Sequence, residues 1–153
     1  MKDLTLVIPA KLESESLPIF LKEIINLNCK KIVVLEEADT QTINAIKNFD
    51  DLRIVFQKNK GYGSALIEGI QSVETDFFCI INADGSMDPK YLYEMLSKIK
   101  IQNLDFLFAS RYENLGGSED DSFITKLGNF IFTKIGNIFF DLKITDILFT
   151  YVM

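Results

Sequence analysis

The feature that most constrains the fold is a run of five apolar residues, 77–81, which stops abruptly at Asn82. A continuous apolar run of this length is typical of a strand buried on both faces, and such strands occur in parallel sheets covered by helices. Pro89 then opens a segment with apolar residues at helical spacing. The pattern predicts a strand, a polar turn and a helix, with the turn at the carboxyl end of the strand.

The same alternation of short apolar runs and amphipathic segments extends along the chain as far as residue 110. Such alternation implies right-handed βαβ units and a mostly parallel sheet flanked by helices, which is the α/β class. We expect the helix after the second strand to be capped by Thr40 or Thr42. The expected strands are 4–8, 31–35, 52–56, 77–81 and 106–109.

The bulk properties exclude several classes of function. The chain has 153 residues, 48% of them hydrophobic, which suits one domain with a sizeable core. Its net charge of −6 and scattered basic residues argue against a nucleic-acid partner. The absence of histidine excludes His-based triads and His-ligated zinc.

The chain begins without a signal-peptide pattern and contains no uninterrupted apolar stretch long enough to span a membrane. Cys29 and Cys79 lie in or beside apolar runs, which is typical of buried thiols in a reducing compartment. We therefore expect a cytoplasmic protein, with peripheral attachment to the inner face of the membrane left open.

Oxygen-bearing side chains follow the apolar run 77–81 at the edge where open α/β sheets bind ligands. Asn82, Asp84 and Ser86 are therefore candidate ligands for a Mg²⁺ or Mn²⁺ ion that is shared with substrate phosphates. The alternative is that Asp84 and Ser86 only form the turn and that Asp88 only caps the helix that begins at Pro89.

Six short motifs follow one another along the chain in an order found in one known family. They are I-P-A-K-L-E (8–13), V-V-L-E-E (33–37), N-K-G-Y-G-S-A (59–65), N-A-D-G (82–85), A-S-R-Y (109–112) with the pair Gly116-Gly117, and G-N (128–129) with T-D (145–146). The chain resembles the family-2, GT-A-type glycosyltransferases, particularly the polyprenyl-phosphate branch that includes dolichol-phosphate mannose synthase-like enzymes.

The resemblance implies a GT-A, Rossmann-like fold in which residues 1–110 form the nucleotide-sugar-binding core. Residues 111–153 then correspond to part of the acceptor region of the same domain, so we expect the acceptor side to be incomplete and the chain to be truncated. The implied activity is a metal-assisted, inverting transfer of a hexosyl group from a nucleotide-sugar donor. The implied acceptor is a polyprenyl phosphate or another acceptor at a membrane surface, in glycan biosynthesis of the cell envelope.

Donor-binding roles follow from the same resemblance. Pro9, Ala10, Glu13, Glu37, Lys60, Gly61 and Asp84 match the family's donor-binding positions. Glu13 and Glu37 would accept hydrogen bonds from the base or ribose, and Gly61 would let the backbone approach the nucleotide beside the positive charge of Lys60. The alternative for Glu13 and Glu37 is a solvated carboxylate on a loop, and we favour that interpretation for Glu36. The alternative for the loop that contains Gly61 is a plain turn into a helix.

Two residues are implied on the acceptor side. Arg111 would contact the diphosphate or an acceptor phosphate, for which its fork geometry is suited. An ion pair with Glu113 or Asp105 is the alternative for Arg111. Asp146 is the candidate catalytic base, although an acceptor that is already an anion needs no strong base. A structural or capping carboxylate is the alternative for Asp146.

The sequence departs from the family pattern at its acidic positions. Asn82 replaces a carboxylate of the metal motif, and Glu36-Glu37-Ala38 replaces Asp-Asp-Gly. These changes lower the expected metal affinity and support a second hypothesis, a non-catalytic module that binds a nucleotide sugar or a lipid phosphate. A nucleotidyltransferase is a third hypothesis, but residues 10–16 lack the glycine-rich phosphate loop it requires.

The segment 123–140 is predicted to be a helix whose apolar residues cover more than one face. Its main apolar face contains Phe123, Leu127, Phe130, Ile131, Ile135 and Ile138, and Phe132, Phe139 and Phe140 extend beyond it. We expect this face to pack in the core, with a membrane interface or missing protein as the alternatives.

Overall fold

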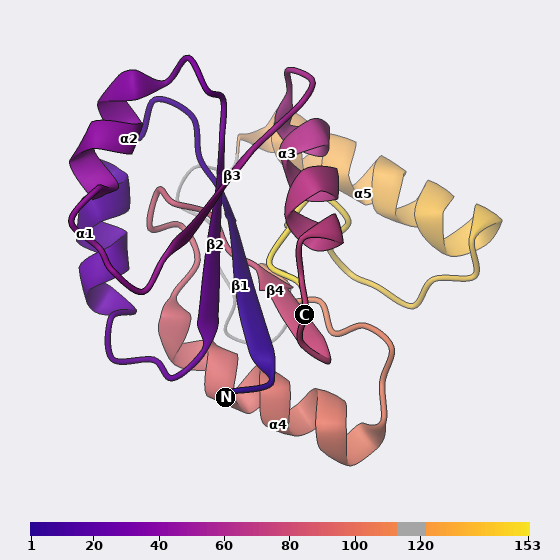
Figure 1. Ribbon diagram of the computed structural model, residues 1–153. Coiled ribbons are helices and arrows are strands. Elements are labelled where there is room, and N and C mark those ends of the chain that lie inside the picture. Colours follow the sequence, from indigo (N-terminus) through magenta and orange to yellow (C-terminus); the bar gives the residue numbers. More distant parts are fainter. Residues whose placement is uncertain (113–121) are drawn as a thin grey trace.

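The computed structural model of the protein describes residues 1–112 and 122–153 (Figure 1). Four parallel strands form a sheet in the order β3-β2-β1-β4. The strands are β1 (Leu4–Pro9), β2 (Lys30–Leu35), β3 (Arg53–Phe56) and β4 (Phe77–Ile80). The helices are α1 (Ser16–Glu23), α2 (Thr40–Ile46), α3 (Tyr62–Gln71), the 3₁₀ turn η1 (Pro89–Tyr91), α4 (Leu92–Gln102) and α5 (Phe123–Phe139). The predicted α/β class and the first four predicted strands are confirmed.

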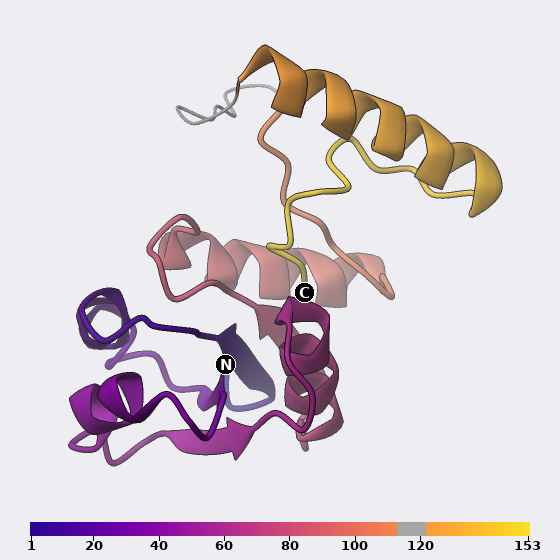
Figure 2. The ribbon, with the colours of Figure 1, turned by 90° about the horizontal axis from the view of Figure 1, so that it is seen from above.

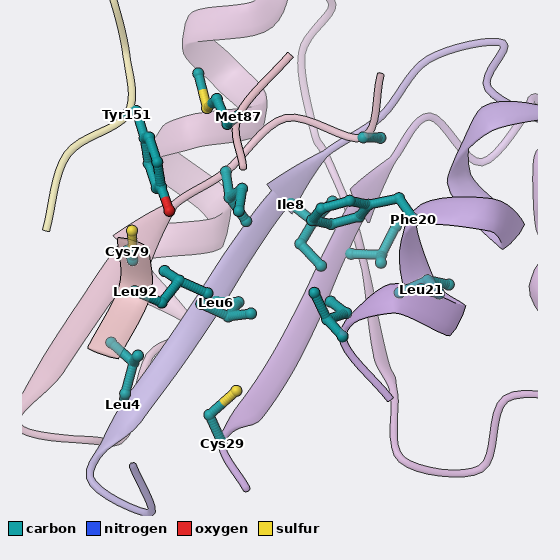
Figure 3. Close-up of a cluster of buried hydrophobic side chains, with 14 of the residues drawn as sticks. Leu4, Leu6, Ile8, Phe20, Leu21, Cys29, Cys79, Met87, Leu92 and Tyr151 are labelled. Carbon is teal, nitrogen blue, oxygen red and sulfur yellow. The ribbon is translucent and has the colours of Figure 1, made fainter. Parts of the chain in front are cut away.

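Both faces of the sheet are covered by helices. Alternate residues of β1 point to opposite faces, so that Leu6 and Ile8 pack in one cluster with Phe20 of α1, while Val7 packs in another with Ala65 of α3. The larger cluster also contains Leu92, Met95 and Leu96 of α4. Figure 3 shows this cluster, in which Phe20 lies near Ile8, and Leu92 lies near Leu6 and Cys79. Because one cluster covers each face of the sheet, β1 is buried along its whole length.

The fifth predicted strand is wrong as a member of the parallel sheet. Within the described residues, the segment 106–109 forms only an isolated antiparallel bridge, between Phe108 and Val152. Val152 also bridges Ile80 of β4, so the end of the chain inserts between β4 and the segment 106–109. Helix α4 supplies the crossover that a parallel partner of β4 would need, but residues 151–153 occupy the position beside β4, so the segment 106–109 pairs with them instead.

The predicted cap of α2 is also wrong. Asp39 is the N-cap residue, and its side chain accepts a hydrogen bond from the backbone N–H of Thr42. An aspartate one position before the first helical residue places its oxygen within reach of the third N–H of the helix, which a threonine inside the helix cannot do.

Helix α5 has the predicted bounds to within one residue, but the expected core packing of its apolar face is wrong. Phe123, Leu127, Phe130, Ile131, Ile135 and Ile138 are all exposed, as are Phe132, Phe139 and Phe140. The buried residues of α5 are instead Asn129, Thr133 and Gly136. Figure 2 shows α5 standing apart from the sheet and its covering helices.

The polar face of α5 is buried because it binds the returning chain. The hydroxyl of Thr133 accepts from the N–H of Ile147 (3.2 Å), and the side-chain oxygen of Asn129 accepts from the N–H of Leu148 (3.1 Å). Backbone N–H groups outside a sheet need such partners when they are buried. No helix in the described parts of the chain is long and apolar enough to cross a membrane.

Candidate active site

A pocket of about 240 Å³ lies at the carboxyl ends of the strands. Its lining comes from the loops that follow β1, β2, β3 and β4 and from the start of α3. The lining residues are Pro9, Ala10, Lys11, Glu13, Glu36, Gln57, Gly61, Tyr62, Ala65, Asn82, Ala83 and Asp84. The structure therefore brings together six of the predicted site residues, which are Pro9, Ala10, Glu13, Gly61, Asn82 and Asp84. Glu37, Lys60, Ser86, Arg111 and Asp146 do not line the pocket.

The loop after β1 is held in shape by α2. Asp39 accepts from the N–H of Leu12 (2.7 Å), and Thr42 accepts from the N–H of Glu13 (3.0 Å). Burial alone raises the pKa of Asp39, but the hydrogen bonds from Leu12 and Thr42 outweigh it and hold the pKa below its ordinary value. The ionised carboxylate thus fixes the wall of the pocket that carries Glu13.

Sequence reasoning missed four polar residues of the pocket, Lys11, Glu36, Gln57 and Tyr62, and two of these, Glu36 and Gln57, lie directly after a strand. Glu36 is the first residue after β2 and forms an ion pair with Lys11 (2.9 Å), whereas Glu37 is exposed. Gln57 is the first residue after β3 and donates to the carbonyl of Asn59 (2.7 Å). The carboxyl ends of parallel strands meet at one edge of the sheet. The position directly after each strand is therefore the sequence signal that could have identified Glu36 and Gln57 as site residues.

The turn after β4 presents Asp84 to solvent. One carboxylate oxygen of Asp84 accepts from the N–H of Ser86 (2.9 Å), and Gly85 has a positive φ of 79°, which favours glycine. Asp88 caps η1 by accepting from the N–H of Lys90 (2.9 Å), which is the capping role that the alternative interpretation of this turn gave it. Asp84 therefore lines the pocket from an exposed turn.

The oxygens of this turn fit a divalent ion only when other ligands are added. Asp84 supplies a carboxylate, Ser86 a hydroxyl and Asn82 an amide oxygen, and the last accepts a hydrogen bond from Tyr62 (3.0 Å). No group of three or more His, Cys, Asp or Glu residues in the described ranges is placed to hold a metal. Mg²⁺ commonly uses one or two carboxylates together with substrate phosphates, and this donor set has that composition.

Arg111 and Asp146, predicted for separate roles, contact one another. The Nε of Arg111 donates to Asp146 Oδ2 (2.8 Å), its Nη2 donates to Oδ1 (3.1 Å), and its backbone N–H donates to Oδ2 (3.2 Å). The Asp146 side chain is fully buried. Arg111 also lies over the ring of Phe149, 5.1 Å from its centroid. The bidentate pair joins the segment before residue 113 to the returning end of the chain.

A second cavity, of about 280 Å³, lies at the opposite edge of the sheet. Five of its six charged side chains are paired with one another: Lys31 with Asp51 (2.8 Å), and Glu74 with both Lys30 (3.2 Å) and Arg53 (3.1 Å). These pairs account for all the charges there except that of Asp50, so we assign the candidate site to the pocket at the carboxyl edge.

The fold and the pocket define an α/β protein with a ligand site at the carboxyl ends of its parallel strands. The sequence profile of the Glycosyl transferase family 2 matches residues 5–153, so the chain belongs to this family. The four-stranded parallel sheet with helices on both faces is consistent with the family's GT-A, Rossmann-like fold.

Curated relatives are named as glycosyltransferases. Proteins of Mycobacterium bovis and of two strains of Mycobacterium tuberculosis, each called an uncharacterized glycosyltransferase, are 33% identical to this chain over 97 residues. The matched region covers 62% of this chain and 43% of each relative. The match thus extends over less than half the length of these relatives.

Proposed function

We propose that this protein transfers a sugar from a nucleotide-sugar donor, held in the pocket at the carboxyl edge, to an acceptor with inversion at the anomeric carbon. The observation that carries the proposal is the pocket itself, in which Glu13, Glu36 and Asp84 meet Gly61 at the start of α3. Membership of the Glycosyl transferase family 2 supports this chemistry.

The donor's base and ribose would lie against the loops after β1 and β2. Glu13 and Glu36 line this part of the pocket and can accept hydrogen bonds from N–H or hydroxyl groups. We assign to Glu36 the role that the sequence suggested for Glu37, because Glu36 lines the pocket. Pro9 and Ala10 supply apolar contact to the same ligand.

The diphosphate would lie between α3 and the turn after β4. Helix α3 begins at Tyr62, so its first N–H groups favour a phosphate, and Gly61 has a φ of 106° with no atom within 4 Å of an added Cβ. Lys60 adds positive charge beside this loop. Asp84, with Asn82 and Ser86, would hold Mg²⁺ or Mn²⁺ there together with the phosphates. A bound divalent ion supplies Lewis-acid stabilisation of the leaving diphosphate.

The acceptor proposed is a phosphate, and the polyprenyl-phosphate branch is the proposed subtype. A neutral hydroxyl acceptor would need a base, and Asp146 is the candidate base. Both oxygens of Asp146 accept hydrogen bonds from Arg111, so this carboxylate is poorly placed to take a proton from the acceptor. A phosphate anion needs no deprotonation before it attacks, and Arg111 can attract it. We therefore propose that Asp146 orients Arg111 toward the acceptor.

A lipid-bound acceptor agrees with the surface of α5. The helix exposes its large apolar side chains, and its sequence contains Lys126 and Lys134 but no acidic residue. Apolar side chains with flanking lysines favour the interface of a membrane that contains anionic lipids, although the whole chain has a net charge of −6. We propose that α5 lies on such a membrane surface.

A second candidate function is a non-catalytic module that binds a nucleotide sugar or a lipid phosphate. The observation that favours it is the side chain of Asn82, a neutral group whose oxygen already accepts from Tyr62. Asp84 is then the sole carboxylate among the three predicted metal ligands, which reduces the expected metal affinity.

A thermal-shift panel tests donor binding. UDP-, GDP- and dTDP-sugars are added with Mn²⁺ or with EDTA to the unmodified protein, to Asp84→Asn and to Asp76→Asn, an exposed control before β4. One nucleotide class is expected to stabilise the protein by about 2.7 kcal/mol at a hundredfold excess over Kd with Mn²⁺, and by less with EDTA. Asp84→Asn is expected to remove the Mn²⁺-dependent part of the shift and Asp76→Asn to keep it. A folded protein that responds to no nucleotide contradicts the proposal.

A further inference from the structure

The turn that carries Asp84 comprises residues 82–88. We call it the Asp84 turn. A hydroxyl group forms a hydrogen bond to each end of this turn, and both contacts involve one of two consecutive residues, Thr150 and Tyr151. Thr150 reaches Asn82 through Tyr62, and Tyr151 reaches Asp88 directly. These residues lie more than sixty positions away in the sequence from the ends they hold, yet both contacts converge on one short turn.

The first contact is a directed chain of hydrogen bonds. The hydroxyl of Tyr62 donates to Asn82 Oδ1 (3.0 Å) and lies 2.9 Å from the hydroxyl of Thr150. Because a tyrosine has one O–H, Thr150 must be the donor to Tyr62. Tyr62 is 45% exposed, so core packing fixes its ring only in part.

The second contact comes from inside the core. The hydroxyl of Tyr151 donates to the backbone carbonyl of Asp88 (3.0 Å). Its ring is 2% exposed and points into the cluster that contains Cys79 and Leu92 (Figure 3). A phenylalanine would fill the same space, so the hydroxyl contributes this one hydrogen bond and nothing to packing.

Inside the Asp84 turn, Ala83 and Met87 are each 2% exposed and pack in the larger core cluster, whereas residues 84–86 form an exposed tip. The N–H of Asn82 points to the sulfur of Met87 (3.3 Å), and Ser86 donates to Asp84 within the exposed tip. Gly85 has a positive φ, and Asp84 is exposed. The position of the Asp84 carboxylate therefore depends on the buried Ala83 and Met87 and, in addition, on the hydrogen bonds that hold Asn82 and Asp88.

We propose that Tyr62 and Tyr151 are positioning residues that hold Asp84 where its carboxylate meets the metal–diphosphate group, so that segment 150–151 forms part of the donor site. The inference rests on the proposed function, since it assigns a role within the same pocket. It also gives Asn82 a second role beside the proposed metal contact, because its side-chain oxygen accepts a hydrogen bond from Tyr62.

The test measures binding of Mn²⁺ itself, by the electron paramagnetic resonance signal of the free ion, in the presence of the saturating nucleoside diphosphate identified in the thermal-shift panel. Tyr62→Phe and Tyr151→Phe each remove one hydroxyl. Tyr93→Phe, on the exposed side of α4, is the matched control. Affinity for the nucleotide in EDTA is measured in parallel, below the melting temperature of every variant.

We expect Mn²⁺ affinity to fall about fivefold in each of the two variants, as for the loss of one hydrogen bond, with nucleotide affinity in EDTA and the control unchanged. Unchanged Mn²⁺ affinity in either variant would overturn the inference while leaving the proposed function intact. An equal loss of nucleotide affinity in EDTA would also overturn it, because it indicates a general structural effect. An unmodified protein without Mn²⁺-dependent nucleotide binding contradicts the proposed function together with the inference.

Discussion

At the scale of single residues, buried carboxylates organise this protein more than its exposed ones do. Asp39 caps α2 and also holds the N–H of Leu12, which has a φ of 58° that a leucine rarely adopts. Asp146 receives three hydrogen bonds from Arg111. Each carboxylate connects two segments that are far apart in the sequence, so each shapes one side of the proposed site.

Replacing Asp39 by Ala should lower the free energy of unfolding by about 2 kcal/mol at pH 7, because a cap and a loop hydrogen bond are lost together. The pKa of Asp39 is lowered in the folded state, so its stabilisation is present above the unfolded pKa of about 3.9 and is lost as pH falls through the folded value. Urea unfolding at pH 7 and at pH 3 measures both effects. An equal loss at both pH values contradicts this account of Asp39, and Asp105→Ala, at an exposed position, is the control.

Replacing Asp146 by Ala should cost about 3 kcal/mol, because the half-buried guanidinium of Arg111 loses its carboxylate. The double variant Arg111→Ala/Asp146→Ala should be more stable than the sum of the two single losses predicts, by about 1 kcal/mol or more. Denaturant unfolding of the four proteins completes the cycle. Strictly additive losses would show that the pair contributes no coupling.

At the scale of elements, periodicity predicted where helices form better than where their faces point. The spacing of Phe123, Leu127 and Phe130 correctly indicated a helix with an apolar face. It did not indicate that Asn129 and Thr133 would pack inward, because their partners are backbone N–H groups of the returning chain. Backbone donors without sheet partners carry no sequence signal, so the orientation of α5 lay outside sequence reasoning.

The double substitution Phe130→Ser/Phe139→Ser tests the apolar face of α5. Both side chains are exposed, so the free energy of unfolding should change by less than about 0.5 kcal/mol. Co-sedimentation with vesicles containing anionic phosphatidylglycerol should fall strongly, and binding of the unmodified protein should weaken with salt.

Thr133→Val is the matched control on the buried face. It removes the acceptor of the Ile147 N–H and should cost about 1 kcal/mol of stability while vesicle binding persists. Vesicle binding that survives the double substitution, or that is absent from the unmodified protein, contradicts a membrane-facing role for α5.

At the scale of the whole molecule, the site divides into a part that the sequence predicts and a part that it does not. Pro9, Asn82 and Asp84 could be placed together because parallel strands bring their carboxyl ends to one edge. The contacts of Tyr62 with Thr150, and of Arg111 with Asp146, depend on the path by which the end of the chain returns to β4. That path is set by antiparallel bridges of single residues, which leave no periodic pattern to detect.

The most direct test of the central claim is product formation from a nucleotide sugar and a polyprenyl phosphate in detergent or vesicles. The nucleotide is the one selected by the thermal-shift panel, and the product is analysed by mass spectrometry and by NMR of the anomeric carbon. We expect one nucleoside diphosphate released per glycosylated lipid phosphate, with inverted configuration and Mn²⁺ dependence, and no product with Asp84→Asn. Nucleotide binding without any turnover by the unmodified protein, or a product with retained configuration, would contradict the account.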